Sequence, residues 1–286
     1  MADGVIQRRV GSGMLAELRP DRWRHGAVEL IIDGTPQSHV CLDDPTALFF
    51  EYVQRMGHVI DLVRPAGQPI TAVHLGAGAL TLPRYIGATR PGSRQQVIEL
   101  DRDLVDLVRE ELPWDRAAGI RVRYGDARAT LARLPAALRG TVDVLVVDVF
   151  AGAQTPAHVT SGEFYREAAA FLAPDGVLLV NVADGPPMPY ARSQAVTVGE
   201  AVGPVLALAE TGVLKGRRFG NVVLAAVPAG IPNHWHATLL GAGPYPAGVL
   251  GGEELQRFTA GARAVDDATA TGSPAPGRGV LRFASD

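Results

Sequence analysis

The sequence is poor in cysteine, with Cys41 alone among its 286 residues. A single cysteine forms no internal disulfide and no thiolate metal cluster, which excludes the disulfide-stabilised scaffold of a small secreted domain. We therefore expect a reducing compartment, the cytoplasm. The chain also lacks the His-Glu-x-x-His spacing of a zinc protease, and we expect no metal site.

Long hydrophobic runs and an excess of basic charge are missing too. No apolar stretch approaches the length of about 20 residues that crosses a bilayer, so we expect no membrane span. No apolar segment follows the first charged residues, so we expect no signal peptide. The formal net charge of −3 gives no electrostatic reason to bind nucleic acid or an anionic membrane. The expected partners are small molecules.

What the sequence does have is a regular alternation of strand-like and helix-like segments from residue 71 onward. Apolar runs predict strands at 71–76, 94–100, 120–124, 143–149, 176–182, 204–211 and 219–227. Helical spacing predicts helices at 79–89, 101–112, 126–138, 160–173 and 188–202. This order is typical of an α/β fold with a seven-stranded, Rossmann-like sheet. The last two strands are expected to form an antiparallel pair that closes one edge.

The two ends of the chain differ from this central part. Residues 26–44 have the pattern of a β-hairpin around the turn Asp33-Gly34, and 46–63 have helical spacing. We expect three parts: a β-rich lobe with a linking helix over 1–63, a nucleoside-binding catalytic domain over 64–240, and a C-terminal extension over 241–286. The extension is expected to end in a loose Gly- and Pro-rich tail. Because residues 26–63 cannot form a core alone, we expect a homodimer with this lobe at the interface.

Glycines and acidic residues follow the predicted strands at the points where they end. Ligands of open α/β sheets bind beyond the carboxyl ends of the strands. Those ends offer, in order, Gly76 and Gly78, Glu99 and Asp101, Gly125 and Asp126, Asp148, and finally Asn181 and Asp184. The first two glycines let the backbone approach a ligand. Glu99 lies about 20 residues further on, the usual spacing for a carboxylate that binds ribose hydroxyls.

The other strand-end acids have possible roles as well. Asp126 could accept a hydrogen bond from an adenine amino group, and Asp148 could act as a base or hold a cationic group. Each acid also has an ordinary structural role available, since Glu99 and Asp126 could cap helices and Asp148 could belong to a turn. Their occurrence in register at successive strand ends favours a nucleoside site. Thr81 stands where a dinucleotide fingerprint has its third glycine, which favours a single nucleoside.

Several segments resemble the spermidine/spermine synthase (aminopropyltransferase) family. They are IIDGTPQSHV, YVQRMGHV, IELD, YGDA, VVDVFAGAQTP and EFYREAAAFLAPDGVLLVN, within residues 26–230. The resemblance implies a β-rich lobe joined to a methyltransferase-like domain, decarboxylated S-adenosylmethionine or S-adenosylmethionine as the cofactor, and an amine acceptor. It implies catalytic roles for Tyr52 and Asp148. It also implies cofactor contacts from Gln37, His58, Gly76, Gly78, Glu99, Asp101, Gly125, Asp126 and Asp148.

Among the departures from that family's pattern, three remove an acid. Ala79 stands in place of the glycine-loop aspartate, Gln54 in place of a glutamate, and Ala151 in place of the second aspartate of the segment that begins at Asp148. Fewer acids match a dicationic amine less well. Without an aspartate at position 79, we also expect the carboxylate of ordinary S-adenosylmethionine to be tolerated.

Three functions remain open on the sequence. The first is aminopropyl transfer, which we adopt. The second is S-adenosylmethionine-dependent methyl transfer on the same fold, and the third is nucleoside binding without catalysis.

Overall fold

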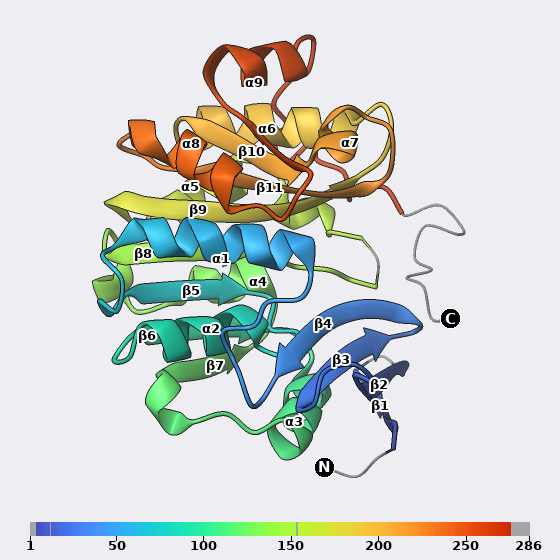
Figure 1. The fold of residues 1–286 in the computed structure, drawn as a ribbon. Helices are drawn as coiled ribbons and strands as arrows, with labels where there is room; N and C mark the ends of the chain where they lie inside the picture. The colour runs from blue at the N-terminus through green and yellow to red at the C-terminus, as the bar shows by residue number, and fades with distance from the viewer. Residues whose placement is uncertain (1–3, 12, 153, 276–286) are drawn as a thin grey trace.

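The computed structural model describes residues 4–11, 13–152 and 154–275 (Figure 1). It contains a four-stranded antiparallel sheet and an eight-stranded mixed sheet. The small sheet, called the N-terminal sheet below, has the order β1-β2-β3-β4 and consists of β1 (Ile6–Val10), β2 (Met14–Pro20), β3 (Ala27–Ile32) and β4 (Thr35–Cys41). The β3–β4 turn is at Asp33 and Gly34, as the hairpin pattern predicts.

The large sheet has the order β12-β10-β11-β9-β8-β5-β6-β7. Its parallel part consists of β5 (Thr71–Leu75), β6 (Arg94–Glu99), β7 (Ile120–Tyr124), β8 (Val142–Val147) and β9 (Leu172–Asp184). Its antiparallel part consists of β11 (Gly220–Ala226), β10 (Val205–Glu210) and β12 (Ala247–Leu250). The α/β class is confirmed, and the strand count is eight rather than seven.

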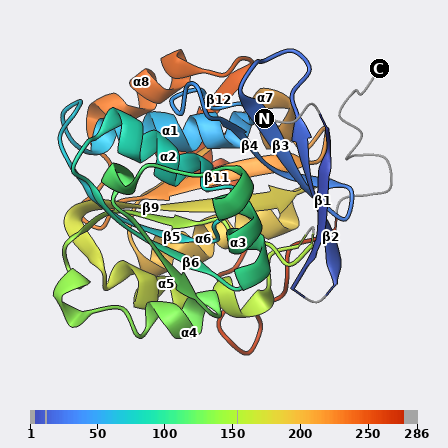
Figure 2. The same ribbon diagram turned by 90° about the horizontal axis from the view of Figure 1, so that it is seen from below.

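Helices cover both faces of the large sheet (Figure 2). One face packs against α4 (Ala127–Leu131), α5 (Gly162–Ala169) and α6 (Pro189–Ala201). The other packs against α1 (Glu51–Val63), α2 (Thr81–Thr89) and α8 (Asn233–Ala242). Strand β8 between them is apolar and buried at Val142 and from Val144 to Val147, as expected for a central strand covered on both faces.

The remaining helices are short or peripheral. They are α3 (Arg102–Glu111), α7 (Thr211–Leu214), α9 (Gly252–Phe258), and the 3-10 turns Arg116–Ala118, Ala136–Leu138 and Ala157–Val159. Within the described part of the chain, no helix combines the length and the apolar character that a bilayer span requires.

Three sequence expectations differ from the structure. The helix predicted over 126–138 ends at Leu131, because Pro135 cannot continue it and a 3-10 turn follows. The antiparallel pair β10 and β11 does not close the sheet, because β12 adds a further edge strand on β10. The C-terminal extension contributes β12 and α9 to the fold. The last part of the expected tail, 276–286, lies outside the described residues.

The N-terminal sheet packs on the carboxyl-end side of the large sheet, next to α3 (Figures 1 and 2). Its inner side chains form an apolar cluster with the loop after β5 and with α3, called the roof cluster below. The cluster contains Val10, Ala16, Leu18, Val28, Leu30, Ile32, Val40, Ala79, Leu80, Val97, Leu104, Leu107, Val108 and Leu112. The N-terminal sheet therefore gains its core from the large domain.

Candidate active site

A cavity of about 580 Å³ lies at the carboxyl ends of β5, β6, β7 and β8. The N-terminal sheet closes it from above with residues that include Val10, Met14, Ile32, Gln37 and Ser38. This is the edge at which open α/β sheets bind ligands. The structure brings nearly all of the predicted site residues to this cavity: Gln37, Tyr52, Gly76, Gly78, Glu99, Asp101, Gly125, Asp126 and Asp148.

In the loop after β5, two positions require glycine because neighbouring atoms leave no room for a Cβ. Gly76 has a φ of 92°, and a Cβ there would lie 2.1 Å from the carbonyl oxygen of Asp148. Gly78 has a φ of 49°, and its Cβ would lie 2.3 Å from Ser38 Oγ. The loop is thus held between the end of β8 and the N-terminal sheet, with its backbone facing the cavity.

Ala79 and Leu80 do not take part in lining this cavity. Both side chains are almost completely buried in the roof cluster, and the Ala79 N–H donates to Ser38 Oγ at 3.0 Å. Leu80 has a left-handed backbone with a φ of 64°. The expectation that residue 79 faces the tail of the cofactor is therefore wrong for this chain, because the docked N-terminal sheet covers that position.

Glu99 links the glycine loop to the start of α3. Its Oε2 accepts the Ala77 N–H at 2.8 Å, and its Oε1 accepts the Asp101 N–H at 3.0 Å. Burial raises the pKa of Glu99 above its usual value, although these backbone donors oppose the shift. The next acid, Asp101, caps α3 by accepting the Leu104 N–H at 3.1 Å. Glu99 and Asp101 therefore both line the cavity and hold backbone N–H groups around the start of α3.

Asp126 has two partners in the structure. It caps α4 by accepting the Ala129 N–H at 2.9 Å, and its Oδ2 lies 2.6 Å from Nε2 of His158. Burial acts to raise the pKa of Asp126, but the hydrogen bonds from Ala129 and His158 hold it below its usual value. His158 also lines the cavity. Sequence reasoning missed it, because it lies in a loop 32 residues from its partner and carries no local signal.

Asp148 lies at the end of β8, between α1 and β9. Its Oδ1 accepts from Asn181 Nδ2 at 2.8 Å, and its Oδ2 accepts from the Tyr52 hydroxyl at 3.4 Å. Burial raises the pKa of Asp148, and these two hydrogen bonds oppose the shift. Burial also raises the pKa of Tyr52 well above its usual value, so its hydroxyl stays protonated. These two hydrogen bonds hold the Asp148 carboxylate in one orientation, in which it can bind a cationic group or accept a proton.

Of two further predicted cofactor-binding residues, Gln37 lines the cavity and His58 does not. Gln37 donates from Nε2 to the carbonyl oxygen of Gly152 at 3.2 Å, so it connects the N-terminal sheet to the chain after β8. His58, predicted to bind cofactor, does not line the cavity. His58 lies six residues after Tyr52 on α1, which corresponds to about 9 Å of rise and about 120° of rotation, so the two side chains point in different directions. Its ring instead lies near Gly243 and Asp61.

Asp184, Gln54 and Ala151 complete the set of residues that the sequence singled out. Asp184 is buried outside the cavity, where it accepts the N–H of the next residue, Gly185, and the N–H of Ala191 in the first turn of α6. Gln54 donates to the carbonyl oxygen of Phe49 at 2.8 Å and does not line the cavity. Ala151 does line it, with an apolar methyl group.

The cavity is strongly acidic. Among the described residues that line it are four carboxylates, Glu99, Asp101, Asp126 and Asp148, and no lysine or arginine. The lining residue His74 is buried next to Gln95, and burial lowers its pKa to about 4, so it is neutral at physiological pH. Across residues 4–11, 13–152 and 154–275, no group of three potential metal ligands is present. The arrangement suits a cationic organic ligand.

Comparison with known proteins agrees with this geometry. A probable spermidine synthase from Corynebacterium glutamicum is 31% identical, with a TM-score of 0.81 over 93% of this chain and 96% of that one. The chain belongs to the spermidine synthase family. The polyamine aminopropyltransferase of Vibrio vulnificus is 30% identical over 135 residues, which are 47% of this chain and 44% of that protein. The chain thus matches less than half the length of this curated relative.

The fold is shared more widely than this family of transferases. Human methyltransferase-like protein 13, solved in complex with SAH, has a TM-score of 0.50 at 16% identity, over 76% of this chain and 93% of that one. At this identity the likeness concerns the methyltransferase-like fold alone. No protein-family profile matches the chain.

Proposed function

We propose that this spermidine synthase family member transfers an aminopropyl group from decarboxylated S-adenosylmethionine to an amine acceptor, in the cytoplasm. The observation that carries this proposal is the acidic cavity with four carboxylates and no lysine or arginine among its described lining residues. The donor is a sulfonium with a terminal ammonium group, and the acceptor is an amine. All these groups are cationic, and a partly desolvated cation needs matched anions.

The same charge distribution favours the decarboxylated donor over ordinary S-adenosylmethionine. The carboxylate of the ordinary cofactor would enter a cavity whose described lining has no lysine or arginine, and whose two histidines are His74 and His158. Like charges about 4 Å apart repel by roughly 4 kcal/mol at an effective dielectric constant near 20. Asp148, to which we assign no role in holding the nucleoside, is the acid that would oppose this carboxylate. On this ground methyl transfer is the less favoured activity.

Specific roles for the side chains follow from their places. Glu99 and Asp101, next to the glycine loop, are proposed to bind the ribose, and Asp126 the adenine amino group. Gln37, Gly76, Gly78 and Gly125 are proposed to complete the nucleoside site. Asp148, oriented by Asn181 and Tyr52, is proposed to hold the acceptor ammonium and to take its proton. His58 lies outside the cavity lining, and we assign it no contact with the cofactor.

The chemistry then needs positioning more than activation, because the sulfonium is itself a good leaving group. The acceptor loses a proton to Asp148, and its nitrogen forms a bond to the propyl carbon next to sulfur. The carbon–sulfur bond breaks, and its electron pair stays on the sulfur of neutral methylthioadenosine. The proton passes from Asp148 to solvent after product release.

Among the described lining residues, Asp148 is the one carboxylate that is not assigned to the nucleoside, so it is the anion available to the acceptor. Gln54 lies elsewhere, and Ala151 is apolar. A second ammonium group on the acceptor would find no carboxylate at these two positions. We therefore propose an acceptor with one ammonium group beside Asp148 and an uncharged remainder, so that a monoamine is used at least as well as a diamine of equal length.

Two measurements on the purified protein test the proposal. Calorimetry with each donor should give at least about tenfold tighter binding for the decarboxylated form. Mass spectrometry after incubation with butylamine or putrescine should show addition of an aminopropyl group. Equal or tighter binding of ordinary S-adenosylmethionine, or addition of a methyl group, would replace the proposal by methyl transfer. Binding of methylthioadenosine with no product from any amine would favour nucleoside binding without catalysis.

A further inference from the structure

The segment after α9 lies against the chain that follows β8, on the outside of the cavity. We call residues 263–275 the C-terminal strap and residues 154–162 the active-site loop. The loop contributes Pro156 and His158 to the cavity lining. The Gly- and Pro-rich tail predicted from the sequence begins within the strap, at Thr269, yet the strap makes hydrogen bonds at both ends of the active-site loop.

At one end the strap pairs with the start of the loop. The Thr155 N–H donates to Ser273 Oγ at 2.8 Å, and the Ser273 N–H donates to the Thr155 carbonyl oxygen at 3.1 Å. Gln154 Nε2 donates to the Ser273 carbonyl oxygen at 2.6 Å. Ser273 is fully buried and Thr155 is nearly so. This is a specific, solvent-shielded attachment rather than a surface contact.

At the other end the strap reaches the start of α5. The Gly162 N–H donates to the Val265 carbonyl oxygen at 2.9 Å, and Ser161 Oγ donates to Asp267 Oδ1 at 2.5 Å. The Asp267 N–H donates to Glu163 Oε2 at 3.0 Å. The loop is therefore held at its beginning and at its end by the same short segment.

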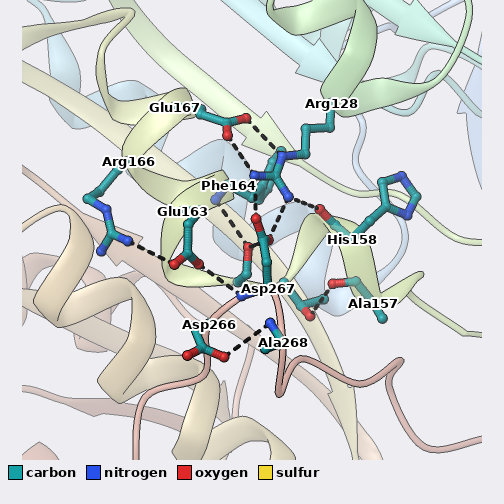
Figure 3. Close-up of polar contacts among 12 residues, drawn as sticks. Arg128, Ala157, His158, Glu163, Phe164, Arg166, Glu167, Asp266, Asp267 and Ala268 are labelled. Carbon is teal, nitrogen blue, oxygen red and sulfur yellow. Dashed lines mark hydrogen bonds and ion pairs between the residues drawn. The ribbon is translucent and has the colours of Figure 1, made fainter.

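Arg128 joins this attachment to the wall of the cavity (Figure 3). Its Nη1 and Nη2 donate to the two Asp267 carboxylate oxygens at 2.6 and 3.0 Å, and its Nε and Nη2 donate to Glu167. Its Nη1 also donates to the carbonyl oxygen of His158 at 3.3 Å. Arg128 lies on α4, two residues after Asp126. The guanidinium thus fixes the backbone of His158 while the His158 ring contacts Asp126.

We infer that the C-terminal strap, through Asp267 and Arg128, positions His158 against Asp126 and so completes the nucleoside side of the cavity. Asp267 and Arg128 are positioning residues, and His158 is a binding residue of the site. The inference rests on the proposed function for what the site binds, but not for the attachment of the loop. A bidentate arginine–carboxylate pair has the geometric specificity that such positioning requires.

The test compares Asp267→Asn with Asp266→Asn in the full-length protein. Asp266 is the neighbouring residue, and its side chain accepts, among the described residues, from Ala268 and Thr269 of its own turn. Hydrogen exchange should become faster in residues 154–162 of Asp267→Asn and should stay at the wild-type rate in Asp266→Asn. Affinity for methylthioadenosine should fall about tenfold in Asp267→Asn alone. Ser273→Ala should likewise speed exchange at Gln154 and Thr155.

A double-mutant cycle separates positioning from general stability. His158→Ala should weaken methylthioadenosine binding by about tenfold, and adding Asp267→Asn to it should cause little further loss. Additive losses, or unchanged affinity in His158→Ala, would overturn the inference. So would equal exchange rates in the two aspartate variants. If the wild type binds no methylthioadenosine, the proposed function fails, and the exchange comparison alone decides whether the strap holds the loop.

Discussion

At the scale of single residues, Asp148 is the clearest case of a side chain placed at a cost in stability. Burial raises the pKa of Asp148 above the ordinary value of 3.8, so its charged form is disfavoured in the folded protein. Because the folded state binds the proton more tightly than the unfolded state, this group lowers stability as the pH rises through and above 3.8. Such a cost is typical of functional carboxylates.

Replacing Asp148 should therefore separate activity from stability. We expect Asp148→Asn to lower aminopropyl transfer by about 10²–10⁴-fold, the usual contribution of a general base. Its melting temperature at pH 7 should equal or exceed that of the wild type, and the difference should vanish well below pH 3.8, where Asp148 is protonated in both the folded and the unfolded state. Thermal unfolding of both proteins at the two pH values checks this. A marked fall in melting temperature at pH 7 would mean that the charge stabilises the fold.

Glu99 supports a second prediction at this scale. Its two oxygens already accept backbone N–H groups from Ala77 and Asp101, so an amide at this position can keep only one of them. We expect Glu99→Gln to weaken methylthioadenosine binding by about 1–3 kcal/mol, as for a buried hydrogen bond to a charged group. Calorimetry measures the change, with Glu253→Gln at an exposed position of α9 as the control. Equal affinities in the folded variants would remove Glu99 from the nucleoside site.

At the scale of elements, the sequence predicted the parallel strands and the residues that line the cavity at their carboxyl ends well. The reason is physical: β8 is a nearly continuous apolar run, β7 alternates apolar with basic residues, and a glycine or an acid lies at or just after the carboxyl end of each of β5, β6, β7 and β8. The short strand β12 was missed, because its four residues Ala247–Leu250 include a glycine and form a strand only by pairing with β10. The burial of Ala79 was also unpredictable, because Ala79 is covered by the N-terminal sheet, whose residue Ser38 lies about 40 positions earlier in the chain.

Leu80 shows how two local effects compete at the start of α2. Its left-handed backbone costs about 1–2 kcal/mol for a non-glycine residue, but its side chain is fully buried in the roof cluster. Loss of a buried leucine costs about 2–5 kcal/mol, which is larger. We therefore expect Leu80→Gly to lower the free energy of unfolding by about 1–3 kcal/mol net.

A companion variant makes this prediction sharper. Leu80→Ala loses the same burial but keeps a Cβ in the left-handed conformation, so it should be less stable than Leu80→Gly by about 1 kcal/mol. Urea unfolding of the three proteins gives the values. If Leu80→Gly were more stable than the wild type, backbone strain rather than burial would dominate at this position.

At the scale of the whole molecule, the N-terminal sheet has a different role from the one its composition indicated. It was expected to need a partner subunit because it cannot form a core alone, yet its inner face is covered by Ala79, Leu80, Val97 and α3 of the same chain. That sheet is the roof of the cavity, and Gln37 connects it to Gly152 beyond β8. By packing on the large domain, the N-terminal sheet thus both covers its own inner face and closes one side of the cavity.

The homodimer stays a prediction, and a different feature of the lobe now supports it. Trp23, in the β2–β3 turn, has 95% of its surface exposed, and Phe49 is 53% exposed. Tryptophan is among the residues most enriched at the centres of protein interfaces. We expect a dimer in sedimentation velocity at micromolar concentration, and a shift toward monomer in Trp23→Ala. Tyr245→Ala, which removes a 72% exposed aromatic near β12, should leave the dimer intact. A monomeric wild type, or equal dissociation in the two variants, would exclude the N-terminal lobe as the interface.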